Sequence, residues 1–112
     1  MGAGQLRGQQ VLEAGVRQAW PFLTFTSPHP DSERRLYIDT GFAIEPDGQR
    51  CDDGDAFRAA AALIAFSAYT VTEVETTLEG GLALTFNDQK VLRIDGVASS
   101  FSAGEPWWIG AL

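Results

Sequence analysis

Short segments rich in apolar and β-branched residues recur along this chain between polar turn residues, and the period of two that is typical of a half-buried β-strand is clearest at 82–86. In the first part, this pattern predicts strands at 11–16 and 20–26, and a third strand over 36–44 that bends or bulges at Thr40-Gly41. In the second part, it predicts strands at 70–78, 82–86 and 91–94. Tight turns rich in Gly, Asn and Asp separate these last three strands, so they are expected to form a meander.

The two strand-rich parts resemble each other in sequence. The aligned segments are 11–13 with 71–73, 23–25 with 84–86, and 36–39 with 92–95. Each part is too short to bury a core alone. Two similar β-meanders that share one core are therefore predicted.

A polar stretch and a helix are predicted between the two meanders. Pro46-Asp47-Gly48 is typical of a turn, and the alanine-rich segment 56–66 contains neither Gly nor Pro. One of the aspartates just before this segment is expected to cap the helix. Apolar residues recur in this segment at helical spacing and form one face of the predicted helix. We expect this face to be mostly buried against the sheet. The face comprises Phe57, Ala60, Ala61 and Ile64, widened by Leu63 and Phe66.

Together these elements predict an α+β fold that is rich in β-structure, with about six strands and one helix near 55–67 packed on the sheet. The length of 112 residues favours one domain over 1–112. Within it we distinguish a first repeat over about 6–44, a linker and helix over 45–68, a second repeat over about 69–101, and an aromatic C-terminal segment over 102–112.

Composition narrows the classes of function. The net charge of −7 disfavours binding to nucleic acid, because phosphate backbones attract basic proteins. No apolar run approaches the length of a membrane span, and the first ten residues do not form a signal-peptide pattern. Cys51 is the only cysteine, so no intrachain disulfide framework is expected. These features indicate a cytoplasmic protein. The acidic charge is explained either by solubility or by a basic protein partner that it attracts.

No catalytic, metal or cofactor site is assigned from the sequence. His29 is the only histidine and lies between two prolines in a loop, which indicates a solvated side chain. One His and one Cys exclude the usual zinc ligand sets, and the aspartates of 47–55 do not have EF-hand spacing. Asp39 and Asp95 occupy equivalent places in the two repeats, where turn chemistry explains them better than a catalytic pair does. We therefore expect a protein that is not an enzyme.

The strongest functional feature is the C-terminal segment that contains Glu105, Trp107 and Trp108. On an extended segment, adjacent side chains point to opposite faces. One tryptophan can then fill the core, while the other faces solvent, a partner or a groove. Because large aromatic residues are enriched at interface hot spots, these three residues are the predicted partner-binding site.

Several short segments resemble a family of small actinobacterial proteins of unknown function: Leu6-Arg7-Gly8, Tyr69-Thr70-Val71, Gly81–Asp88 and Trp107-Trp108. The resemblance implies a β-meander, a short helical segment, a hairpin and a tryptophan-bearing C-terminal strand. It implies no activity and no catalytic residue. The shape of that family is also similar to that of small immunity proteins that neutralise toxins, and this similarity is an analogy of fold alone.

The leading hypothesis is a non-catalytic, immunity-like module that binds a protein partner through its acidic surface and C-terminal tryptophans. The first alternative is a small-molecule-binding domain or weak enzyme, because the loop over 26–35 is longer than its counterpart in the second repeat. Its pocket would use His29, Arg34 and Tyr37. The second alternative is a homodimer that forms through an unprotected edge strand.

Overall fold

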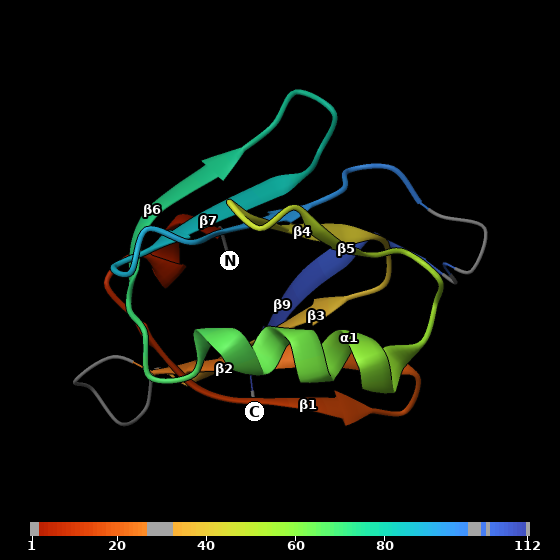
Figure 1. The fold of residues 1–112 in the computed structure, drawn as a ribbon, viewed down its shortest axis with the longest axis horizontal. Helices are drawn as coiled ribbons and strands as arrows, with labels where there is room; N and C mark the ends of the chain where they lie inside the picture. Colours follow the sequence, from red (N-terminus) through yellow and green to blue (C-terminus); the bar gives the residue numbers. More distant parts are fainter. Residues whose placement is uncertain (1–2, 27–32, 99–101, 103, 112) are drawn as a thin grey trace.

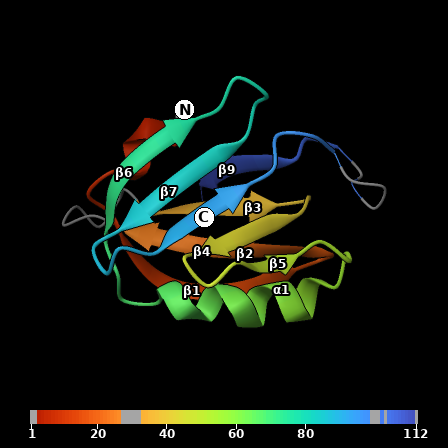
Figure 2. The ribbon, with the colours of Figure 1, turned by 45° about the horizontal axis from the view of Figure 1, so that its top comes forward.

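The computed structural model describes residues 3–26, 33–98, 102 and 104–111 of the chain. Over these residues the chain forms nine strands, which lie in two antiparallel sheets. Sheet A has the order β1-β2-β3-β9 and sheet B has the order β5-β4-β8-β7-β6 (Figures 1 and 2). The strands of sheet A are β1 (Gln10–Arg17), β2 (Trp20–Thr26), β3 (Arg34–Ile38) and β9 (Trp107–Ala111). Those of sheet B are β4 (Phe42–Glu45), β5 (Gln49–Cys51), β6 (Val71–Thr76), β7 (Leu82–Phe86) and β8 (Val91–Ile94).

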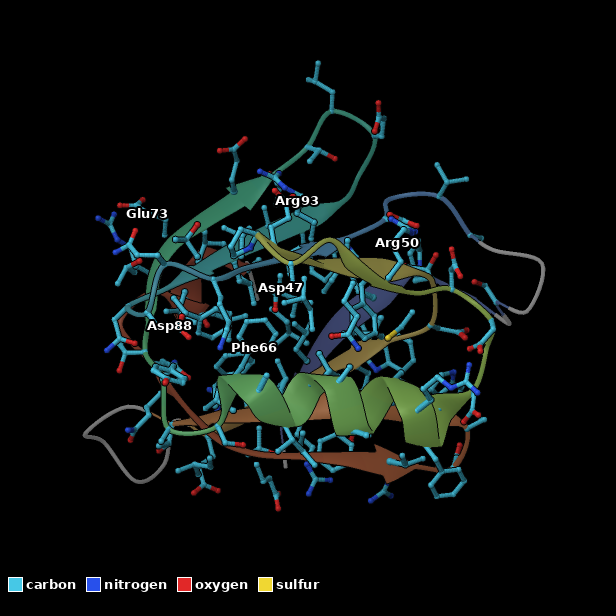
Figure 3. The ribbon with its side chains drawn as sticks, viewed as in Figure 1. Asp47, Arg50, Phe66, Glu73, Asp88 and Arg93 are labelled. Atoms are coloured by element: carbon cyan, nitrogen blue, oxygen red, sulfur yellow. The ribbon has the colours of Figure 1, made fainter. Side chains whose placement is uncertain are left out.

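The two sheets share one hydrophobic core, which confirms the predicted α+β fold. Leu23 and Leu36 enter this core from sheet A, and Leu84 and Leu92 enter it from sheet B. Helix α1 (Ala56–Leu63) packs against β1 and β2 along one side of the sheets (Figure 2). The 3-10 helix η3 (Ile64–Phe66) continues α1, and a second one, η1 (Ala3–Leu6), precedes β1. At the end of η3 lies Phe66, which is labelled in Figure 3, and its ring stacks on Phe86 of sheet B.

Strand pairing in the first three strands is repeated in β6, β7 and β8. In the β1–β2 pair the register shifts between Val11 and Glu13, and in the β6–β7 pair it shifts between Val71 and Glu73. These are equivalent positions in the two aligned segments. The two meanders therefore share a local irregularity of the backbone as well as a hydrophobic pattern.

The edge strands β1 and β6 meet where each begins. Gln10 forms an isolated antiparallel bridge with Thr70, which is its own equivalent in the second meander. Two backbone hydrogen bonds flank this bridge, one in each direction, from Val11 to Tyr69 (3.0 Å) and from Val71 to Gln9 (2.9 Å). The two meanders thus contact each other here through a pseudo-twofold pair of interactions.

The prediction of one bent third strand over 36–44 is wrong. The chain leaves sheet A after Ile38, and β4 begins in sheet B at Phe42. Two backbone hydrogen bonds and one from a side chain hold the crossing segment: the Asp39 N–H donates to Pro106 (2.7 Å), Gly41 accepts from Asp95 (3.0 Å), and the Thr40 hydroxyl donates to the Val97 carbonyl (2.8 Å). These contacts come from distant parts of the chain, so the local sequence does not reveal the change of sheet.

The nine strands exceed the predicted six for two further reasons. The polar segment Gln49–Cys51 forms β5, which pairs with β4 across the predicted turn at Pro46-Asp47-Gly48. Its Gln and Arg side chains are exposed, so no hydrophobic alternation marks it. The C-terminal tryptophan segment is extended, as expected, and pairs with β3 as the edge strand β9.

The helix forms where predicted and Asp55 caps it, but the predicted buried face is only partly correct. The Asp55 carboxylate accepts hydrogen bonds from the N–H groups of Phe57 and Arg58, each at 3.1 Å. The side chain of Phe57 is 77% exposed and that of Ile64 is 57% exposed. The helix turns toward the core a set of residues that overlaps the predicted face but contains Ala59 in place of Phe57, Ala61 and Ile64, because small alanines allow it to approach β1 and β2 closely. That set is Ala59, Ala60 and Leu63, with Phe66 beyond the end of the helix.

Candidate functional site

Trp107 and Trp108 lie on opposite faces of sheet A, as the alternation of side chains along a strand predicts. Trp107 packs against the hydrophobic core. Its indole N–H donates a hydrogen bond to the backbone carbonyl of Gly80 (2.8 Å), so this ring has a structural role in joining β9 to the turn between β6 and β7. Trp108 lies on the outer face, in contact with other aromatic rings.

Four aromatic rings cover the outer face of sheet A, and we call them the aromatic face: Trp20, Phe22, Tyr37 and Trp108. Phe22, Tyr37 and Trp108 are directly paired across β2, β3 and β9. The Tyr37 and Trp108 rings stack at 5.3 Å with an angle of 17°, and the Phe22 and Tyr37 rings lie 5.7 Å apart. Trp20 and Trp108 meet edge to face at 5.1 Å and 85°.

One end of the aromatic face is closed by polar and small residues. A Cβ atom on Gly15 would lie 2.7 Å from the Phe22 ring, so the ring rests over this glycine. On its other side, the Arg35 guanidinium carbon lies 4.2 Å from the Phe22 ring centroid. Interaction with the Tyr37 hydroxyl raises the pKa of Arg35, and the carboxylate of Glu13, 3.6 Å away, adds to this shift. This end of the face is therefore occupied by groups of the protein itself.

The other end is hollowed. Trp20, Asp39, Gly104, Glu105 and Trp108 line an open hollow of about 240 Å³, which we call the tryptophan cleft. Asp39 is buried, with 7% of its surface exposed. Glu105 is exposed. The cleft thus combines two indole rings with two carboxyl groups.

A second hollow of about 470 Å³ adjoins the tryptophan cleft, and Glu105 and Trp108 line both. Trp107 and Gly96 also line this second hollow. A Cβ atom on Gly96 would lie 2.3 Å from the carbonyl oxygen of Glu79, so only glycine allows the chain to pass here. The structure therefore brings together all three residues of the predicted partner-binding site.

The residues proposed for a pocket near the 26–35 loop have different surroundings. Arg34 and Tyr37 are three positions apart on β3, so their side chains point to opposite faces of sheet A. Arg34 donates to the backbone carbonyl of Glu33 (2.8 Å), and Tyr37 belongs to the aromatic face. His29 lies outside the described residues. The described geometry does not bring Arg34 and Tyr37 together.

The equivalent aspartates of the two repeats have different partners. Asp95 pairs with Arg50 at 2.7 Å, and both side chains are partly exposed. Asp39 lines the tryptophan cleft. Sequence reasoning did not identify Trp20 and Asp39 as site residues. Trp20 stands two positions before Phe22, which places both on one face of a strand, but only the strand order reveals that this face also contains Trp108.

The outer face of sheet B is polar where the outer face of sheet A is aromatic. The Phe22–Tyr37 pair of sheet A corresponds to the Ala83–Arg93 pair of sheet B. Arg93 (labelled in Figure 3) forms an ion pair with Glu45, and both side chains are partly exposed. The second meander therefore forms with alanine and arginine at the two positions where the first meander has phenylalanine and tyrosine.

Comparisons with known proteins found no relatives: no protein-family model, no curated protein and no solved structure matches this chain. Within the described part of the chain, every helix is too short or too polar to cross a membrane. Over the same residues, no group of three or more His, Cys, Asp or Glu side chains is arranged to hold a metal ion.

Proposed function

We propose that this chain is a non-catalytic binding module that holds a basic protein partner on the outer face of sheet A. Trp108 is the central contact residue and Glu105 contributes negative charge at its edge. Trp107 supports the site from the core side. In the immunity-like form of this proposal, the partner is a basic toxin that the module neutralises.

The observation that carries the proposal is the difference between the two outer faces. Phe22 and Tyr37 of sheet A have Ala83 and Arg93 as their equivalents in sheet B. The meander can therefore form without aromatic residues at these positions. Aromatic rings that the fold does not need, and that remain partly exposed as Trp108 does, are typical of protein interfaces. The net charge of −7 adds long-range attraction for a basic partner.

The test is affinity capture from a lysate of the source organism, with the tagged wild-type protein, the Trp108→Ala variant and the Phe57→Ala variant. Phe57 is a matched control because it is also an exposed aromatic residue, but it lies on α1. We expect one basic protein that wild type and Phe57→Ala retain and that Trp108→Ala loses. The captured protein is then purified, and its affinity for the three proteins is measured by calorimetry.

Two results would contradict the proposal. One is a partner whose affinity is the same for wild type and Trp108→Ala while both are folded by circular dichroism. The other is the absence of any protein that the wild type retains above the untagged background. A salt titration gives an independent check, since charge attraction predicts weaker binding as ionic strength rises.

A homodimer is the second candidate, and a specific feature of β9 favours it. Within the described residues, β9 is an edge strand that pairs only with β3, and it contains no charged residue. By contrast, the edge strand β6 carries Glu73 and Glu75, which discourage pairing with another strand. Light scattering coupled to size exclusion measures the mass in solution. A mass of about 12.1 kDa at all concentrations would exclude the dimer.

A further inference from the structure

We propose that the tryptophan cleft binds one cationic side chain, lysine or arginine, of the partner. This inference rests on the proposed function and adds the chemistry of its central contact. The cleft is defined by Trp20, Asp39, Gly104, Glu105 and Trp108, as described above.

The two indole rings provide a preformed aromatic corner. Trp20 and Trp108 stand at 85° to each other with their centroids 5.1 Å apart. A cation over the face of an indole ring is attracted by its quadrupole when it lies within about 6 Å of the centroid, and Trp is the strongest aromatic partner for this contact. Tyr37 stacks on Trp108 at 17° and fixes the plane of that ring, so little side-chain freedom remains to be lost on binding.

Exposed Glu105 gives the same corner a negative charge, and Asp39 lies beside it. Asp39 is buried at the cleft and Glu105 is exposed at its edge. Within the described part of the chain, Glu105 takes part in no ion pair, so its charge is available to a ligand. A cation held by both the rings and a carboxylate gains more than either contact gives alone.

The positive charges nearest the aromatic face do not occupy this corner. Arg35 lies over Phe22, at the opposite end of the face, and is paired with Glu13. Arg17 is the register partner of Trp20 and stands beside it on β1, on the side of β2 away from β3, and it is not among the residues that line the cleft. The cleft itself therefore combines rings and negative charge, which is the chemistry of a cation site.

The arrangement favours a cationic side chain over a neutral sugar. Sugars stack on flat ring platforms, whereas Trp20 and Trp108 are perpendicular. One face of Trp108 is also covered by Tyr37. The hollow of about 240 Å³ suits the end of a long side chain that enters from a partner surface.

The test uses nuclear magnetic resonance of the three indole N–H groups in the full chain, because Trp20, Trp107 and Trp108 each give one signal. Acetyl-Gly-Lys-Gly-amide and acetyl-Gly-Arg-Gly-amide are titrated separately, with acetyl-Gly-norleucine-Gly-amide as the uncharged control. We expect the signals of Trp20 and Trp108 to shift and saturate with at least one of the cationic peptides. The signal of Trp107 should move less, because its N–H is bonded to Gly80.

Variants assign the effect to the cleft. Glu105→Gln should weaken binding of the cationic peptide by about threefold to tenfold, as expected for loss of one exposed charge contact of about 1 kcal/mol. Glu75→Gln removes an exposed acid on β6 and should leave the affinity unchanged. Trp20→Leu should abolish the shift of the Trp108 signal, and a retained circular dichroism spectrum shows that this variant is folded.

The proposal is overturned if norleucine shifts Trp20 and Trp108 as much as lysine and arginine do, or if none of the three peptides shifts them. It is also overturned if cellohexaose shifts these signals while the cationic peptides do not, because the cleft would then be a sugar site. These results are independent of the capture experiment. A partner that depends on Trp108 without any response to the peptides would leave the binding module standing and remove only the cation site.

Discussion

Trp107 and Trp108 are consecutive in the chain, yet the first is hydrogen-bonded to Gly80 on the core side of β9 and the second stacks on Tyr37 on the outer side. Two residues with the same side chain therefore have separable roles. Trp107 contributes to the stability of the fold, and Trp108 contributes to the proposed interface.

Replacement of the two tryptophans should separate these roles. We expect Trp107→Ala to lower the free energy of unfolding by about 3 kcal/mol, because it removes a large side chain packed on the core and leaves Gly80 without its indole donor. Trp108→Ala loses only ring contacts on the outer face and should cost about 1 kcal/mol. Urea unfolding followed by far-ultraviolet circular dichroism measures both. Equal losses in the two variants would contradict this assignment.

Gly96 should tolerate no side chain. A Cβ atom would lie 2.3 Å from both the carbonyl oxygen of Glu79 and the amide nitrogen of Gly81, and backbone atoms cannot move aside easily. We expect Gly96→Ala to lower the free energy of unfolding by about 3 kcal/mol. Gly4→Ala is the matched control, since a Cβ there meets nothing within 4 Å. Thermal unfolding of both variants should show a large shift only for Gly96→Ala.

Asp55 should stabilise α1 by its capping hydrogen bonds. Asp55→Ala leaves the N–H groups of Phe57 and Arg58 without their carboxylate acceptor and should cost about 1 kcal/mol. Asp47→Ala changes the net charge equally at an exposed turn and should cost much less. Chemical unfolding of the pair gives the difference. A smaller loss for Asp55→Ala than for Asp47→Ala would rule out the capping role.

Cys51 should make the protein less stable at alkaline pH. Burial raises the pKa of the Cys51 thiol, and the negative charge of Asp53 adds to this shift. The folded state thus favours the neutral thiol. Its contribution to stability is complete below the ordinary thiol pKa of about 8.5 and is lost as the pH rises toward the raised pKa.

Comparison of wild type with Cys51→Ala between about pH 7 and 10 isolates this effect, because other titrating groups are common to both proteins. The free energy of unfolding of the wild type should fall more steeply over this range. The thiol should also react slowly with iodoacetamide in the native state, since Cys51 is 7% exposed. Identical pH profiles for the two proteins would show that the thiol does not ionise differently on unfolding.

Local patterns predicted the strands of both meanders well. The period of two marked β7, and turn residues marked the hairpins on either side of it. The same reasoning failed where distant contacts decide the structure. The Asp39–Gly41 crossing is held by residues near 95–97 and 106, and β5 is defined by pairing to β4 alone. Helix α1 turns Ala59 inward and Phe57 outward because close approach to β1 and β2 favours small residues there.

The candidate site was predicted only in part, for the same reason. The period of two placed Trp107 and Trp108 on opposite faces of one strand. The sequence could not show that this strand adds to sheet A beside β3, so Trp20 and Asp39 stayed unrecognised. To predict a surface that three strands form together, one must know the order of those strands in the sheet. A single sequence does not give this order.

The position of β9 has a consequence for the order of events during synthesis. Trp108 lies close to the end of the described chain, whereas Trp20 and Tyr37 are translated early. The tryptophan cleft therefore cannot exist on a growing polypeptide until its final strand has emerged from the ribosome and docked on β3. A nascent chain that has already folded its first meander is still unable to bind, so ligand binding would report only on chains in which β9 has docked on β3.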